Sequence, residues 1–508
     1  MRFVHRKLSS IFVSGFFAVS VDAAPVEGER SRRLDLYVDV TTKQIFAEPG
    51  PNRVHLGVFK REDGEPNADS ASVDGKPADA AVTPAAVEPL PDHLRDPTPE
   101  MTATERRLQA QQRRLEERLD KLAGTPPAAP ATAKKWYDQI SVRGYLQSRD
   151  NFTLDGDRDD VRAWNDASVG EDRNFFIRRA RLIISSAVGE RLFVYLQPDF
   201  ASSAGDTGNV AQLRDAYGDV YLDKDTREYR VRVGQSKIPF SFENLQSSQN
   251  RLSLDRNDAL NSCCRDERDL GAFFYYTPAG TRTVFSDLVR NGLKGSGDYG
   301  VFAFGVYNGQ GANRTERNEG LHTVARFTYP YRFANGQIFE SGVQALTGRF
   351  VPSTDGSLPG LPANRYSNSD GFLDQRVGIH AVLYPQPFGL QAEWNWGRGP
   401  ALNDARTDIE TQSLNGGYVQ AMYRIENAGG TGVWMPFVKW QYFDGAMKFQ
   451  ANAPQTQVRD WEFGLEWQPD AAIRLSMVYQ RYRRNDVTRA PYAFFEADVL
   501  RMQMQLSF

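Results

Sequence analysis

Arginine dominates the residues that could do chemistry in this 508-residue chain. The sequence holds 61 basic residues, 49 Arg and 12 Lys, against 64 acidic residues. An Arg guanidinium stays charged and presents a rigid fork of N–H donors that matches the oxygens of phosphate or carboxylate. The excess of Arg over Lys therefore indicates anion sites, whereas the net charge of −3 excludes a strongly basic nucleic-acid-binding protein.

Several of these arginines occupy every second position of a segment. Arg230 and Arg232, for example, alternate with apolar residues in the segment 229–233. Because side chains point alternately to the two faces of a strand, this pattern predicts sheets with one dry and one polar face. The arginines that alternation places on the polar face are Arg143, Arg179, Arg181, Arg230 and Arg232. By the same argument, Arg326, Arg424, Arg474 and Arg501 face the same way.

The elements that must position these arginines extend over residues 136–508, where segments of about ten residues alternate in polarity. Connections between them are alternately short and long, aromatic residues gather near the segment ends, and the last segment ends in Phe508. These features favour an all-β, antiparallel transmembrane barrel over a soluble sandwich, which would bury its dry face against a second sheet. At roughly 23 residues per strand and connection, about 16 strands are expected, enough to enclose an aqueous channel.

The N-terminal quarter predicts export and a separate leader. Residues 1–23 have a basic head, an apolar run and small residues before a cleavage site, as in a signal peptide; a short N-terminal anchor is the alternative. Residues 24–100 read as a periplasmic leader with short strands and a linker, and 125–135 as a Pro/Ala linker. Between them, 101–124 is a charged helix with leucines seven residues apart. It predicts either a weak coiled coil or a solvated spacer helix.

Four blocks follow one another along the first strands of this barrel: FFIRRARLIISSAVGERLFVYLQPDF (175–200), LRDAYGDVYL (213–222), YRVRVGQSKIPFSFENLQSS (229–248) and RDERDLGAFF (265–274). In order and spacing they resemble the phosphate-selective porin O/P family. That family has a similar Arg-Arg-x-Arg strand before a Gly-Glu-Arg turn, and a Val-Gly-Gln-x-Lys-x-Pro-Phe strand end before a Glu-x-Leu-x-Ser-Ser loop. The resemblance implies a trimeric, sixteen-stranded channel without cofactors in a Gram-negative outer membrane. It also implies passage of anions, with phosphate or polyphosphate preferred.

The resemblance implies that the segment 237–268 folds back into the pore as its constriction. The cations of this segment are Lys237, Arg251, Arg256, Arg265 and Arg268, and Lys237 lies in the strongest motif. Its acidic residues, Glu243, Asp255, Asp258, Asp266, Glu267 and the following Asp269, could instead pair with these arginines and leave a neutral neck. Residues 136–508 hold 41 basic and 44 acidic residues. Anion selectivity therefore requires segregation of the two signs across the lumen.

Three features depart from the family pattern or from strand parity. Cys263 and Cys264 are adjacent in the neck segment and could form a disulfide or remain thiols. The segment 278–298 is longer than a tight periplasmic turn. Arg178 lies on the lipid-side parity, where it could contact lipopolysaccharide phosphates.

Other functions are weighed against the anion channel. A general diffusion porin for small solutes is the nearest alternative, and a structural tether would need a plugged lumen. An enzyme is not expected, because only His322 and His380 lie in the barrel and neither has a serine at strand spacing. No His/Cys cluster indicates a metal, and the acidic run 155–160 is more typical of a solvated loop than of a Ca²⁺ site. Expected partners are inorganic anions, lipopolysaccharide, two further copies in a homotrimer, and the barrel-assembly machinery through Phe508.

Overall fold

The chain divides into two units, Met1–Leu115 and Glu116–Phe508. A computed structural model describes most of the second unit and short segments of the first. The residues it describes are 33–39, 45–46, 53–60, 139–156, 161–164, 166, 169, 175–204, 207–264 and 268–508. The predicted signal peptide, helical segment and Pro/Ala linker lie outside these residues. So do Arg265 and the acidic residues at 157–160.

The leader contains a small antiparallel sheet. Its strands are β1 (Arg33–Asp39), β2 (Ile45–Phe46) and β3 (Arg53–Lys60), and β1 lies between the other two. They lie within residues 24–100, where the sequence predicts short strands.

Sixteen antiparallel strands, β4 to β19, close into one barrel in which each strand pairs with the next along the chain. This result confirms the predicted fold class and strand number. The strands are β4 (Ile140–Asp155), β5 (Phe176–Val188), β6 (Leu192–Ala204), β7 (Thr207–Tyr221), β8 (Tyr229–Lys237), β9 (Arg268–Tyr276), β10 (Phe302–Tyr307), β11 (His322–Arg332), β12 (Ile338–Phe350), β13 (Phe372–Leu383), β14 (Phe388–Leu402), β15 (Ile409–Tyr423), β16 (Val433–Ala446), β17 (Gln455–Gln468), β18 (Ile473–Asn485) and β19 (Phe494–Ser507).

The barrel closes where its last strand, β19, pairs with its first, β4. Phe508 takes part in this seam through two backbone hydrogen bonds. Phe508 N donates to Gly144 O at 3.0 Å, and Phe508 O accepts from Gly144 N at 2.9 Å. A Cβ at position 144 would lie 2.5 Å from the Phe508 ring and 2.6 Å from the Arg181 carbonyl oxygen. Glycine is therefore required there for the seam to close.

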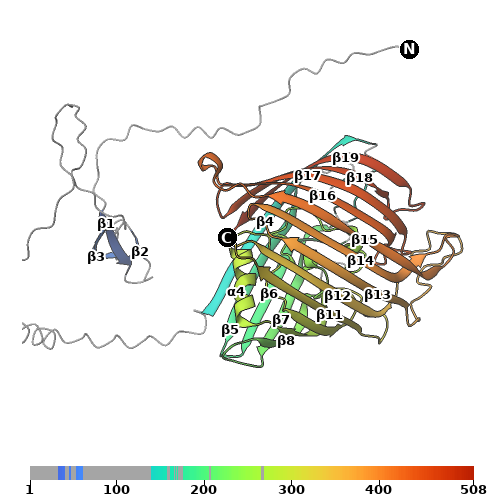
Figure 1. Ribbon diagram of the computed structural model, residues 1–508, viewed down its shortest axis with the longest axis horizontal. Coiled ribbons are helices and arrows are strands. Elements are labelled where there is room, and N and C mark those ends of the chain that lie inside the picture. The colour runs from blue at the N-terminus through green and yellow to red at the C-terminus, as the bar shows by residue number, and fades with distance from the viewer. Residues whose placement is uncertain are drawn as a thin grey trace, which may run out of the picture. The chain divides into compact units, whose positions relative to one another are not determined.

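The two ends of the barrel differ in the length of their connections. The end that holds the C terminus has tight turns such as 189–191, whereas the other end has long connections such as 351–371. Figure 1 shows the C terminus and α4 (Ala279–Arg290) at the same end. Because bacterial outer-membrane barrels have short periplasmic turns and longer extracellular loops, we assign this end to the periplasm.

The wall has an apolar outer face and a polar inner face. On β13, Val377 and Ile379 are 54% and 47% exposed, whereas the flanking inward residues Arg376 and His380 are 1% and 3% exposed. Exposed aliphatic residues alternating with buried charged ones are the reverse of a water-soluble sheet and suit a strand between lipid and a polar lumen.

Among the described residues, two connections that carry α-helices turn into the lumen. The first, 238–267, joins β8 to β9 and carries α2 (Phe242–Leu245) and α3 (Asp258–Asn261); we call it the neck loop. Its α2 is fixed to the far wall because the Glu393 carboxylate on β14 accepts from Ser241 Oγ at 2.9 Å and Phe242 N at 3.0 Å. The second, 277–301, joins β9 to β10 and contains α4.

Helix α4 supplies an apolar face to the interior. Phe285 and Leu288 are buried against Phe242 of the neck loop and Val382 and Tyr384 at the end of β13. No described helix has the length and apolar character needed to cross a membrane. A short 3₁₀ turn, η4 (Ala428–Gly430), lies between β15 and β16.

Candidate functional site

A cavity of about 240 Å³ lies inside the barrel between the wall formed by β4 to β9 and the neck loop. Two carboxylates, those of Asp215 and Asp298, are among its lining residues, so cations outnumber carboxylates five to two. The lining cations, all predicted from the sequence, are Arg143, Arg181, Arg232, Lys237 and Arg268.

Arg232 is the most firmly oriented of the lining cations. Its Nε and Nη2 donate to the two oxygens of Asp219 on β7 at 2.7 and 2.8 Å. Its guanidinium carbon lies 3.7 Å from the centre of the Tyr217 ring, a cation–π distance. Both carboxylate bonds use one edge of the guanidinium.

The Arg181 side chain on β5 contacts both neighbouring strands, β4 and β6, and the neck loop. Its Nε donates to Asp199 on β6 at 2.8 Å, and its Nη1 donates to Tyr145 on β4 at 2.9 Å and to Ser248 at 3.2 Å. The hydroxyls of Tyr145 and Ser248 are themselves 2.7 Å apart. Ser248 is followed in the cavity lining by Gln249 and Asn250. The part of the neck loop that faces the cavity therefore presents hydroxyl and amide groups.

Lys237 lines the cavity and also holds the neck loop. Its Nζ donates to the carbonyl oxygens of Asn244 at 2.7 Å, Leu245 at 3.3 Å and Gln246 at 2.7 Å. These carbonyls belong to the end of α2, whose backbone acceptors have no further turn of helix to pair with. The geometry thus gives Lys237 a structural contact that its position in the sequence motif does not reveal.

The other predicted cations lie outside the lining of this cavity, and Arg265 lies outside the described residues. Arg179 donates to Gln147 Oε1 at 2.8 Å, and Arg230 donates to Asp298 Oδ2 at 2.7 Å. Arg251 donates from Nε to Ser253 O at 3.2 Å within the neck loop. Arg256, also in that loop, is partly buried. Among the described residues, neither Arg143 nor Arg179 contacts a carboxylate.

The acidic residues of the neck loop face the opposite wall. Glu243 Oε1 is 2.6 Å from Lys439 Nζ on β16, and Asp258 Oδ2 is 2.9 Å from Arg484 Nη2 on β18. Sequence reasoning left open whether these acids neutralise the loop's own arginines. In the described part of the loop, Glu243 and Asp258 each contact a cation of a strand on the far wall.

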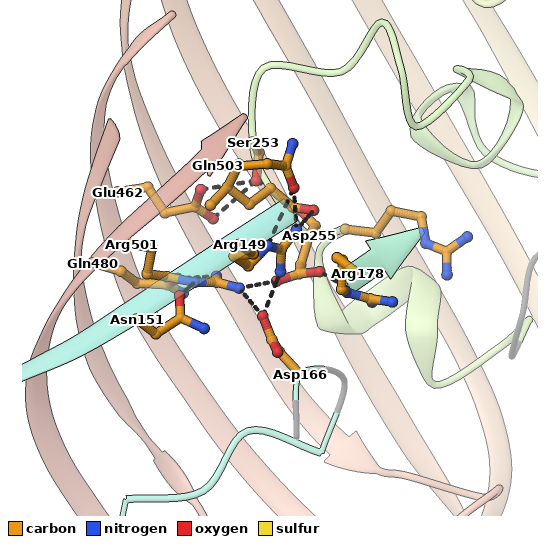
Figure 2. A network of polar contacts seen from close by, with 12 residues as sticks. Arg149, Asn151, Asp166, Arg178, Ser253, Asp255, Glu462, Gln480, Arg501 and Gln503 are labelled. Carbon is orange, nitrogen blue, oxygen red and sulfur yellow. Dashed lines mark hydrogen bonds and ion pairs between the residues drawn. The ribbon is translucent and has the colours of Figure 1, made fainter. Parts of the chain in front are cut away.

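The third acidic residue of the neck loop joins a larger network, shown in Figure 2. Asp255 contacts Arg501 on β19, lies 3.3 Å from Arg149 on β4 and 3.6 Å from Arg178 on β5. Asp166, from the first extracellular connection, contacts both Arg149 and Arg501, the latter at 2.6 Å. The neck loop is thereby fastened to the barrel seam.

Strand parity misplaces Arg178. The parity predicts a lipid-facing side chain, but the side chain turns inward to Asp255 (Figure 2). The cause is a register shift: Gln147 pairs with Arg179 whereas Ser148 pairs with Ile177, which leaves Arg178 as an extra residue. A bulge of this kind re-aims a side chain and cannot be read from alternation alone.

The remaining chemistry-bearing residues form no second site among the described residues. Cys263 and Cys264 are joined by a disulfide in the neck loop. His380 lies in the wall, with Nδ1 3.0 Å from Gln344 Oε1 and Nε2 3.1 Å from Thr328 Oγ1. Within the described residues no cluster of three or more His, Cys, Asp or Glu side chains is placed to hold a metal ion.

Comparison with known proteins finds a family model, phosphate-selective porin O and P, that matches residues 151–508. Among curated proteins, none matches this chain. Solved structures with similar barrels include the outer membrane channel DcaP of Acinetobacter baumannii, with a TM-score of 0.46 and 14% identity over 73% of this chain and 97% of that chain. The anion-selective porin from Comamonas acidovorans has a TM-score of 0.44 and 9% identity over 73% and 99%. OmpF of Salmonella typhi has a TM-score of 0.46 and 13% identity over 73% and 97%.

Proposed function

The chain belongs to the phosphate-selective porin O and P family, and from this premise we propose that it conducts small anions and binds phosphate-like oxyanions in the lumen cavity. It is a channel in the outer membrane of a Gram-negative bacterium. One observation carries the proposal: five cations and two carboxylates line the cavity. An anion that sheds part of its hydration shell in a narrow pore needs such fixed donors in its place.

Within this proposal the lining residues have different parts. Arg143, Arg181, Arg232 and Arg268 would meet the anion, and Arg179 would add to the positive potential of the wall. Lys237 and Arg251 would hold the neck loop in place while contributing charge. Ser248 would offer a hydroxyl to an oxyanion. Anion passage is favoured because, beyond the pairs of Arg181, Arg232 and Arg268 with the wall residues Asp199, Asp219 and Asp215, the cavity is also lined by Arg143 and Lys237. These two cations add to the positive potential of the cavity.

The test is the zero-current potential of the purified protein in a planar bilayer across a KCl gradient, repeated with added phosphate. We expect a potential near the chloride limit and block of chloride current by phosphate. Arg143→Gln should reduce both, whereas Arg459→Gln, which removes an exposed arginine on the outer face of β17, should change neither. A chloride-side potential without block would indicate a general anion porin. A potential near zero would indicate a general diffusion porin, and the absence of current a structural tether.

We further propose that the protein is a homotrimer and that residues 24–135 form a periplasmic extension. Resistance of a trimer band to dodecyl sulfate before heating, in the full chain and in a chain lacking residues 24–135, would test both. A monomer band alone in the full chain would contradict the trimer.

A further inference from the structure

The connection between β9 and β10, residues 277–301, is much longer than a turn between two neighbouring strands requires. It includes α4 and then a stretch, residues 294–299, that crosses the lumen at the periplasmic end; we call this stretch the strap. The connections next to it at this end of the barrel are short: 222–228 between β7 and β8, and 333–337 between β11 and β12. An inward excursion of this length at a periplasmic end needs a physical role.

Ion pairs anchor the strap on opposite sides of the barrel, and the one at Lys294 is buried. At its start, Lys294 Nζ is 2.6 Å from Glu466 Oε1 on β17, with side chains only 4% and 6% exposed. Near its end, Asp298 accepts from Arg230 Nη1 on β8 at 2.7 Å and from Thr277 Oγ1 at 2.7 Å. The strands β8 and β17 lie far apart in the closed order of the barrel. The strap is therefore held across the lumen.

The strap also completes the lumen cavity. Ser296, Gly297, Asp298 and Tyr299 are among the residues that line it. The strap is joined to the neck loop as well, because Gln246 Nε2 donates to Lys294 O at 2.6 Å. The cavity thus has the neck loop toward its extracellular side and the strap toward the periplasm.

We propose that the strap bounds the anion cavity on its periplasmic side and narrows the exit there. Lys294 and Glu466 are positioning residues that hold the strap in this place. The inference rests on the proposed function for the identity of the solute, but the strap's place on the conduction path can be measured with any ion. Removing one partner of a buried ion pair leaves an uncompensated charge that seeks water. The released strap would widen the exit and withdraw Ser296 and Tyr299 from the cavity, while the lining arginines remain.

The experiment compares Lys294→Met, Glu466→Gln and the reversed pair Lys294→Glu/Glu466→Lys in planar bilayers. Both single variants should raise single-channel conductance and weaken block by inorganic phosphate about tenfold, the effect of losing one contact to a charged ligand. The reversed pair should recover both values. The matched control is Lys224→Met, which removes an exposed ion pair with Glu190 between two periplasmic turns, 3.4 Å in length, and should change neither.

A second variant keeps the test independent of folding losses. Ser296→Cys should lose conductance when an anionic methanethiosulfonate is added to the periplasmic side. Unchanged conductance in both single variants would overturn the proposed role of the strap. Full conductance of a labelled Ser296→Cys channel would do the same. Failure of the proposed function looks different: wild-type protein would show no anion preference and no phosphate block, and conductance alone would then decide the role of the strap.

Discussion

Arg268 donates two hydrogen bonds, from Nε at 2.9 Å and from Nη2 at 2.7 Å, to a single oxygen of Asp215. The arginine begins β9 and the aspartate lies on β7, so the pair bridges across β8 inside the lumen. Both side chains line the cavity. The pair therefore contributes donors to the site without contributing net charge, and these two contributions can be separated by mutation.

Arg268→Gln should shift the zero-current potential toward cations and lower stability by about 3 kcal/mol, because Asp215 is left buried and unpaired. In Arg268→Gln/Asp215→Asn the net charge of the lining returns to its original value. This double variant should regain stability and anion selectivity but not phosphate block, which needs the guanidinium. Denaturation temperature on semi-native gels and bilayer potentials measure these effects. Phosphate block at the wild-type level in the double variant would show that Arg268 does not meet the anion.

Lys237→Met should loosen the neck loop, because three carbonyl oxygens at the end of α2 lose their donor. We expect a loss of about 2 kcal/mol and more current noise in the open channel. Lys224→Met, an exposed lysine in a periplasmic turn, is the matched control. If the variant kept the open-channel current noise and the stability of the wild-type protein, the structural role of the Lys237 contacts would be contradicted.

Glu243→Gln and Lys439→Met should each destabilise the protein, and the double variant should lose less than the sum. Glu243 also accepts from Asn257 N at 2.8 Å, so its carboxylate organises the loop as well as pairing with the wall. A coupling free energy of about 2 kcal/mol is expected from a double-mutant cycle of denaturant unfolding in vesicles. Additive losses would mean that the loop acid does not depend on the wall cation.

Raising the pH should release the strap in the wild-type protein. Burial lowers the pKa of Lys294 to about 8, although Glu466 opposes the shift; Arg474 and Arg424 add to it. The lysine is thus charged below this pKa and loses its charge as pH rises through it. Conductance should rise between about pH 7 and pH 9, whereas Lys294→Arg, which stays charged, should give a flat profile. Equal profiles in the two proteins would assign the titration elsewhere.

Much of the barrel can be predicted from alternation and spacing. The period of two over residues 136–508 indicates strands between lipid and water, and it places Arg181 and Arg232 inward. Alternation is reliable because a one-residue slip would move every side chain of a strand to the wrong face. It fails at Arg178, where a bulge adds one residue.

Pairing inside the lumen is much harder to predict. Arg501 and Asp166 are in contact although 335 positions separate them in the chain. The sequence pattern around either residue does not predict the other as its partner. The same applies to Glu243 and Lys439, so the sequence does not predict which cation this loop acid contacts. The strap is missed for a related reason: Lys294 and Glu466 look like ordinary surface charges until the barrel closes around them.

The seam between β4 and β19 makes assembly all-or-none. The first barrel strand stays half-paired until the last residues of the chain arrive, and Phe508 itself supplies the closing bonds to Gly144. A shortened polypeptide without β19 would lose one strand of sixteen, yet it would leave two rows of backbone donors and acceptors bare in hydrocarbon, at several kcal/mol for each group. Pairing of β19 with β4 is therefore needed before the barrel can stand in hydrocarbon.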